Sequence, residues 1–211
     1  QYKASLSNGC FETDIFFLEE KTISAHNLKD DTNLIFDNFF KSRFQKNTIW
    51  LDSKNLNKVK NCKYALKWLN INYTKFQSIL IETPSSSLKS FEDENWKKCI
   101  HSINDIRNVE VGYYMPTETI INCSNEKLRV SNNNECKNFY SSIIEFLKQS
   151  KINSITFDYS VYDFIKNNKD MKMFKWHVWH IDSLNSFNEM ITNNNIGIML
   201  LKNNKFSNNL N

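Results

Sequence analysis

Two carboxylates stand two residues apart in the segment FETDIFF, residues 11–17. The run is rich in aromatic and β-branched residues, which predicts a strand, and alternate side chains of a strand share one face about 6.6 Å apart. Glu12 and Asp14 are therefore expected on the same face, where burial costs free energy unless positive charge compensates them. A hard divalent cation with oxygen ligands would provide that charge. A strand end in water, or an ion pair with lysine, would explain the same spacing.

A second polar pair has the same spacing at the end of the apolar run TIWLD, residues 48–52. Asp52 and Lys54 lie where this predicted strand ends, and active sites of parallel barrels gather at the carboxyl ends of the strands. Asp52 could add a third oxygen to a metal site, and Lys54 could contact a phosphate oxygen or hold the carboxylates in place. An ordinary ion pair at a strand end is the alternative.

His26 is the candidate for proton transfer, and it lies in a loop-like segment after the first strand. An imidazole titrates close to neutral pH, which suits general acid–base catalysis, although a single loop histidine is more often a surface residue. His177 and His180 alternate with tryptophans in KWHVWHI, so we expect one of them to be accommodated in the core. His101 falls on a predicted helix face and is given no role.

Strand-like runs alternate with helix-like segments along the chain and must position these residues. Such alternation predicts a parallel α/β fold, and strands that are apolar nearly throughout suit a sheet covered on both faces. The predicted strands are 11–17, 48–52, 78–83, 109–115, 154–160, 174–181 and 196–201. The predicted helices are 33–44, 56–70, 91–103, 135–150, 161–168 and 183–193. Ser183 is the expected N-cap of the last helix.

Seven strands and six helices fit an eight-stranded (β/α)8 TIM-type barrel that is incomplete because its first strand is missing, and they also fit an open doubly wound sheet. The chain has 3 glycines and no GxGxxG or P-loop motif, which counts against a nucleotide-binding sheet. No low-complexity linker interrupts the pattern, so residues 1–211 are expected to form one domain. The barrel is the preferred prediction.

The composition of 40% hydrophobic and 14% aromatic residues predicts a folded chain of 211 residues, and the net charge is only +4. Lysines are interspersed with acidic residues, which indicates solvated helix faces and not a nucleic-acid surface. No run approaches the roughly 18 apolar residues of a transmembrane segment. No nucleic-acid partner and no transmembrane segment are therefore predicted, and the oligomeric state stays open.

The chain has 5 cysteines and no CxxC pair, so a structural zinc site is not expected. Cys123 and Cys136 bracket a polar segment, predicted as a loop, and could close a disulfide. Such a bond would favour a secreted or periplasmic location over a cytoplasmic one.

The order of these motifs resembles the glycerophosphodiester phosphodiesterase family, a group of phosphatidylinositol-phospholipase-like phosphodiesterases. In that family an E-x-D strand precedes a turn ending in His-Asp, and the next strand ends in E-x-K. Here ETD, the turn ending in His26-Asn27 and the sequence DSK occupy these places, with Asp52 in place of Glu. SILIET resembles the following strand, which makes Glu82 a second candidate for the site. HVWHID resembles the W-T-V-N segment, which implies that Trp179 lines the substrate pocket.

The resemblance implies a phosphoric diester hydrolase that depends on Mg²⁺ or Ca²⁺ and acts on a glycerophosphodiester or a lysophospholipid head group. It implies Glu12, Asp14 and Asp52 as the metal ligands, with catalytic roles for His26 and Lys54. The leaving group would be protonated by the histidine, and the phosphate would be stabilised by the lysine.

Two departures from the family pattern keep alternatives open. The family's first strand carries a catalytic His-Arg pair that has no counterpart before Glu12, and the last strand ends in LLKN where the family commonly has T-D. One alternative is a catalytically inactive barrel homologue that binds a phosphate- or sugar-containing ligand. The other is a structural or interaction protein whose carboxylates form salt bridges.

Overall fold

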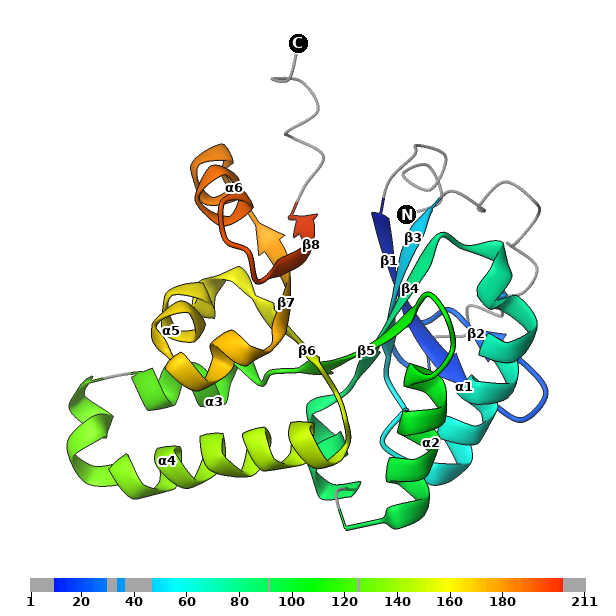
Figure 1. Cartoon of the computed structure of the whole chain (residues 1–211), viewed down its shortest axis with the longest axis horizontal. Coiled ribbons are helices and arrows are strands. Elements are labelled where there is room, and N and C mark those ends of the chain that lie inside the picture. Colours follow the sequence, from blue (N-terminus) through cyan, green and yellow to red (C-terminus); the bar gives the residue numbers. More distant parts are fainter. Residues whose placement is uncertain (1–9, 30–33, 37–46, 91, 125, 203–211) are drawn as a thin grey trace. The chain divides into compact units, whose positions relative to one another are not determined.

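The computed structural model describes residues 10–29, 34–36, 47–90, 92–124 and 126–202 (Figure 1). Its strands are β1 (Cys10–Phe17), β2 (Thr22–Ile23), β3 (Thr48–Ser53), β4 (Ser78–Thr83), β5 (Val109–Tyr114), β6 (Ser154–Asp158), β7 (Lys175–Ile181) and β8 (Ile196–Leu201). Its α-helices are α1 (Val59–Asn72), α2 (Glu94–Asn104), α3 (Thr117–Ser124), α4 (Glu126–Gln149), α5 (Tyr162–Asn167) and α6 (Leu184–Ile191). Short 3₁₀ turns are η4 (Tyr73–Lys75), η5 (Ser85–Ser90), η6 (Tyr159–Val161) and η7 (Lys169–Met173). The predicted strand–helix alternation, and with it the mostly parallel α/β fold, is confirmed.

The chain divides into two compact units. Unit 1 comprises Gln1–Tyr113 and Phe146–Ile152, and unit 2 comprises Tyr114–Glu145 and Asn153–Asn211. In unit 1, β1, β3, β4 and β5 pair in parallel, and the short β2 lies antiparallel to β1. In unit 2, β6, β7 and β8 pair in parallel. Each unit is therefore a run of parallel strands joined through helices.

The alternation within β1 separates a core face from a polar face. Ile15 and Phe17 are fully buried, and Phe17 packs against Trp68 of α1 with ring centroids 6.0 Å apart. Burying such side chains stabilises the fold by about 1.5–3 kcal/mol each. Glu12 and Asp14 take the opposite positions, as the sequence predicts. The apolar residues of β1 therefore fix the side on which its carboxylates lie.

Two disulfides join helices in pairs. Cys62 and Cys99 are buried and connect α1 to α2, with Cα atoms 6.2 Å apart. Cys123 and Cys136 form the bond that the sequence analysis named. The prediction of a loop between Cys123 and Cys136 is wrong, because α3 and α4 occupy most of that segment. It contains no glycine or proline to interrupt a helix.

We expect the Cys62→Ala/Cys99→Ala variant to lose more stability than the Cys123→Ala/Cys136→Ala variant. The first bond spans 37 residues and the second 13, which corresponds to about 4 and about 3 kcal/mol of loop-closure entropy. The first variant also removes sulfur atoms from a buried contact, which adds to its loss. Urea unfolding of both variants measures the difference, and an equal or reversed order would contradict it.

Some elements were not predicted or lie elsewhere. The strand β2 and the helix α3 were missed, since a two-residue strand and an eight-residue helix carry little pattern of their own. The predicted helix 33–44 lies mostly outside the described residues, and within its described part Ile35 forms an antiparallel bridge with Ile23. Ser183 caps α6 as predicted, because its hydroxyl accepts a hydrogen bond from the backbone N–H of Ser186 at 3.1 Å.

The core of unit 2 accommodates one of the two β7 histidines, as expected. His177 is fully buried, and its Nδ1 accepts a hydrogen bond from the backbone N–H of Ile198 at 3.1 Å. Gly197 makes room for this ring, because a Cβ there would lie 2.8 Å from His177 Cε1. No helix in the described ranges is long and apolar enough to cross a membrane.

Candidate functional site

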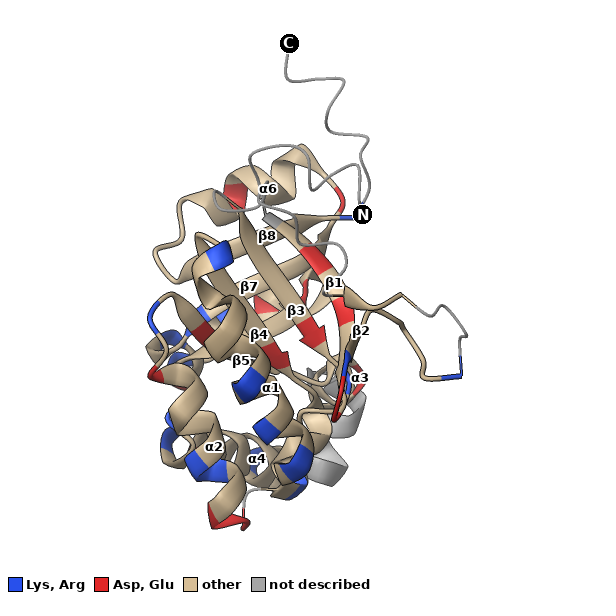
Figure 2. Ribbon diagram, turned by 90° about the vertical axis from the view of Figure 1, so that its right-hand side faces the viewer, with Lys and Arg blue, Asp and Glu red and all other residues tan. Residues whose placement is uncertain are grey.

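The strand register of unit 1 aligns acidic positions across three neighbouring strands. Asp14 of β1 is paired with Asp52 of β3, and Asp52 is paired with Glu82 of β4. Figure 2 shows the acidic residues of these strands in red. All three positions lie toward the carboxyl ends of their strands, where loops are free to vary around a site. The pairing of parallel strands therefore gathers residues that are 30 or more positions apart in sequence.

Glu12, Asp14 and Asp52 form a group that could hold a metal ion. One carboxylate oxygen from each lies within 4.8 Å of the corresponding oxygens of the other two, and all three residues are partly exposed. These three residues are the metal ligands predicted from spacing and motif order, and the structure brings them together. Carboxylate oxygens are the ligands that Mg²⁺ and Ca²⁺ prefer.

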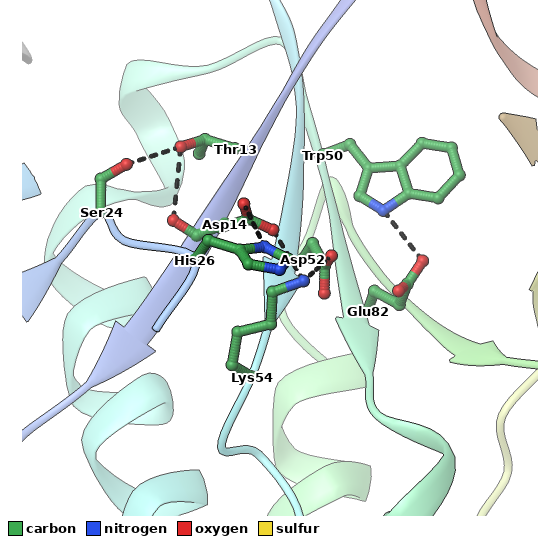
Figure 3. A network of polar contacts seen from close by, with 8 residues as sticks. All are labelled: Thr13, Asp14, Ser24, His26, Trp50, Asp52, Lys54 and Glu82. Atoms are coloured by element: carbon green, nitrogen blue, oxygen red, sulfur yellow. Dashed lines mark hydrogen bonds and ion pairs between the residues drawn. The ribbon is translucent and has the colours of Figure 1, made fainter. Parts of the chain in front are cut away.

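Lys54 lies directly against two of these carboxylates (Figure 3). Its Nζ is 2.7 Å from Asp14 Oδ1 and also donates to Asp52 Oδ2. Its backbone N–H donates to the carbonyl oxygen of Ile15 at 3.0 Å, which extends the strand pairing by one step and fixes the lysine beside Asp14. Burial would favour the neutral amine, but the negative charge of Asp52 and Asp14 raises the pKa of Lys54 above its usual value. The lysine is therefore a permanent positive charge at this site.

The site has more negative than positive groups. Three carboxylates face one ammonium, and burial together with repulsion from Asp14 and Asp52 raises the pKa of Glu12 to about 7. Burial also raises the pKa of Asp52, whereas hydrogen bonds from Lys54 hold the pKa of Asp14 below its ordinary value against the effect of burial. A divalent cation would compensate this excess, so the donor set fits Mg²⁺ or Ca²⁺ in both ligand type and charge.

The raised pKa of Glu12 predicts how the metal-free protein responds to pH. A carboxyl with a folded-state pKa of about 7 and an ordinary value of 4.5 holds a proton in the folded state that the unfolded chain has released. Stability is therefore greatest below pH 4.5 for this group and falls as pH rises through 7, by about 2–3 kcal/mol in total. Urea unfolding in EDTA between pH 5 and pH 8 measures this slope.

The Glu12→Gln variant should flatten that slope because its side chain does not titrate. Glu20 is exposed on the loop after β1, so Glu20→Gln serves as the matched control and should keep the slope. A slope unchanged in Glu12→Gln would show that Glu12 ionises normally.

His26 is held beside the acidic group by the loop that follows β2. The hydroxyl of Ser24 is 2.8 Å from the hydroxyl of Thr13 on β1, and this hydrogen bond ties the loop to the strand (Figure 3). His26 Nδ1 lies 3.2 Å from Asp14 Oδ2, and its side chain is 72% exposed. A carboxylate only accepts hydrogen bonds, so Nδ1 of the ring carries a proton in this contact. Thr13 and Ser24 were missed in the sequence, because nothing in their spacing marks their pairing.

Glu82 has a different role from the acidic group. Its Oε2 accepts a hydrogen bond from the indole Nε1 of Trp50 at 3.1 Å, and both side chains are buried. Trp50 precedes Asp52 by two residues and shares its face of β3, which is the signal that could have identified it. Within the described residues, Glu82 is not one of the grouped metal-ligand candidates. It is paired with Asp52 in the strand register, and its place in the site stays a prediction.

Trp179 belongs to unit 2, on β7. Its ring centroid lies 6.0 Å from that of Tyr114 and 4.4 Å from that of His180. The side chain is partly exposed. Its assignment to a substrate pocket stays a prediction.

The sequence matches no family model and no curated protein. The structure is similar to the crystal structure of a glycerophosphodiester phosphodiesterase from Thermotoga maritima, with a TM-score of 0.54 and 12% sequence identity. The similarity covers 95% of this chain and 84% of that one. The chain therefore has the α/β fold of a glycerophosphodiester phosphodiesterase barrel, and the resemblance inferred from motif order is confirmed at the level of the fold.

Proposed function

We propose that this chain is a metal-dependent phosphodiesterase that acts on a glycerophosphodiester or a lysophospholipid head group. The observation that carries the proposal is the grouping of Glu12, Asp14 and Asp52 around Lys54, at the carboxyl ends of neighbouring parallel strands. The fold similarity to a solved glycerophosphodiester phosphodiesterase supports it. The domain would span residues 1–211.

In this proposal the three carboxylates hold Mg²⁺ or Ca²⁺, which when bound polarises a phosphoryl oxygen and neutralises developing charge. Lys54 donates a charge-assisted hydrogen bond to a non-bridging phosphate oxygen. The contacts of its ammonium with Asp14 and Asp52 hold it in place for that task. The charge that accumulates on the phosphate in the transition state therefore meets a positive group that is already oriented.

His26 would transfer the proton. With Nδ1–H directed to Asp14, protonated His26 can donate from Nε2 to the oxygen of the leaving alcohol. Asp14 stabilises the resulting charge distribution and keeps the ring in one tautomer, as carboxylates do for catalytic histidines. The attacking group is a water molecule or a neighbouring hydroxyl of the substrate.

One observation favours the second candidate, an inactive barrel homologue that binds a phosphate- or sugar-containing ligand. Among the described residues of unit 1, the other histidine is His101 of α2, whose Nε2 lies 3.3 Å from the carbonyl oxygen of Gln149. Within that described part of the unit, the acidic group is thus served by one imidazole. Binding without turnover is the outcome this candidate predicts.

Two disulfides support the further proposal of a secreted or periplasmic location, since such bonds persist in oxidising compartments.

The proposal is tested by calorimetric titration of the purified chain with Mg²⁺ and Ca²⁺, followed by hydrolysis assays with glycerophosphocholine and lysophosphatidylcholine. Binding of one ion together with EDTA-sensitive release of the head group supports the phosphodiesterase. Binding of ion and diester without hydrolysis supports the inactive homologue. If neither ion binds, the carboxylates are structural and the proposal is wrong.

A further inference from the structure

A histidine–aspartate pair lies in unit 2, at the carboxyl ends of β6 and β7. His180 Nδ1 is 2.8 Å from Asp158 Oδ2, and the side chains are 51% and 16% exposed. The other carboxylate oxygen, Asp158 Oδ1, accepts a hydrogen bond from the backbone N–H of Ser160 at 2.8 Å. Asp158 is therefore fixed from two directions and in turn orients the imidazole.

The backbone of His180 adopts a conformation that is unusual for a non-glycine residue. Its φ is 60°, in the left-handed region that non-glycine residues seldom adopt. Two other described residues share a positive φ. Lys151 follows the end of α4, and the side chain of Asn108 donates to the carbonyl oxygens of Tyr73 and Phe76. His180 instead lies inside a strand, where the pairing of β7 with β8 shifts register between Val178 and Ile181.

The strain turns the histidine out of the sheet. Trp176, His177 and Val178 before it are all buried, whereas His180 is exposed beside Asp158. Strained backbone of this kind persists where the surrounding structure holds it, and it is found most often at functional sites. An exposed ion pair contributes too little stability to account for the strain.

Aromatic rings adjoin the pair. The ring of Trp179 meets the imidazole of His180 edge-on, with centroids 4.4 Å apart at 69°. The ring of Tyr114 also packs against the indole, with centroids 6.0 Å apart, and both aromatic residues are partly exposed. An accessible imidazole therefore lies beside an accessible apolar surface.

The chemistry of the pair indicates an anion and not a metal ion. Both oxygens of Asp158 are engaged, and Nδ1 of His180 is directed to one of them. Counting contacts with the described residues, Nε2 of His180 is the ring nitrogen left to meet a ligand, whereas a metal ion requires several donors. Burial acts to raise the pKa of Asp158, but hydrogen bonds from Ser160 and His180 hold it below its usual value. A charged carboxylate 2.8 Å away favours positive charge on the ring, and a ring that carries a proton on both nitrogens donates from Nε2.

We propose that Asp158 and His180 form an oxyanion-binding pair that takes a phosphate group through His180 Nε2, with the organic part of a phosphate ester lying against Trp179. The proposal concerns residues of unit 2 alone, and neither a metal ion nor hydrolysis is needed for it. Free phosphate and a phosphate ester would both bind His180 through the anionic group. The ester would also contact the indole of Trp179, which free phosphate would not.

The test is an NMR titration of the metal-free full-length chain near pH 6, following the imidazole Cε1–H resonances while inorganic phosphate or phenyl phosphate is added. We expect a saturable shift of the His180 resonance, with phenyl phosphate binding more tightly than inorganic phosphate. His101 is the internal control, since its ring contacts a backbone carbonyl and has no aspartate partner among its described contacts. A response of His180 that only matches that of His101 would mean non-specific screening and would overturn the proposal.

Three variants separate binding from folding. Asp158→Asn should weaken phosphate binding about tenfold, because the charge that stabilises the imidazolium is gone. Trp179→Leu should remove the advantage of phenyl phosphate and leave inorganic phosphate unchanged. His180→Gly should abolish binding yet melt no lower than the wild type, since glycine adopts a positive φ without strain. A clearly lower melting temperature of His180→Gly would show a structural role for the histidine and overturn the proposal.

The Asp14→Asn variant distinguishes a failure of this proposal from a failure of the phosphodiesterase proposal. It alters the acidic group of unit 1, so the His180 response to phosphate should be the same in this variant as in the wild type. A response lost in Asp14→Asn would mean that phosphate binds through the acidic group, and the pair would not be a site of its own.

Discussion

The Asp14→Asn variant is expected to bind Mg²⁺ and Ca²⁺ about 100-fold more weakly than the wild type or worse. Asp14 contributes an oxygen to the acidic group and also contacts both Lys54 and His26. The substitution removes one formal charge from the ligand set while keeping the size of the side chain, and loss even of outer-sphere partners costs 10–100-fold in affinity. Calorimetric titration at pH 7.5 measures the change, and thermal melts with and without the ion provide an independent readout.

Asp105 offers the matched control for this variant. It is an exposed aspartate at the C-cap of the helix α2, and it is distant in sequence from the residues of the acidic group. Asp105→Asn should bind both ions as the wild type does. In the metal-free state Asp14→Asn should fold stably, because it also removes a charge that repels Glu12. Unchanged metal affinity in Asp14→Asn would exclude this aspartate as a ligand.

The Lys54→Met variant is expected to be destabilised without metal and to be nearly inactive with it. Removing the ammonium leaves three carboxylates facing one another without their positive partner. The Lys54 side chain is 24% exposed, so solvent screens part of this effect and we expect a loss of about 1–2 kcal/mol. Loss of a donor to the transition-state phosphate should lower kcat by about 100- to 1,000-fold.

Added Mg²⁺ or Ca²⁺ should restore most of the stability of Lys54→Met but not its activity. The ion replaces the missing positive charge among the carboxylates, whereas it does not replace the donor to the substrate. Lys60→Met is the control, because Lys60 forms an exposed ion pair with Glu19 at 3.4 Å and such pairs contribute little. Full activity of Lys54→Met would show that the lysine only holds the carboxylates in place and does not act on the substrate.

Much of this protein could be predicted from local patterns. The alternation in FETDIFF sets Glu12 and Asp14 against Ile15 and Phe17, and the structure buries the latter pair. The apolar runs at 78–83 and 196–201 predict strands with the same bounds that the structure shows. Such features depend on residues two to four positions apart. They can be predicted locally, because each strand or helix must bury its apolar face whatever the rest of the fold.

The strand–helix order and the residue types of the acidic site follow from local sequence patterns. Three contacts depend on how distant segments pack: Lys54 contacts Asp14 as well as Asp52, Trp50 donates to Glu82, and Cys62 pairs with Cys99. The tertiary structure also decided that one histidine of β7 is buried while His180 turns outward to Asp158. These contacts join residues that are distant in sequence, and strand register and helix packing set their distances. Neither register nor packing can be read from local spacing, because both follow from burying all the apolar faces at once.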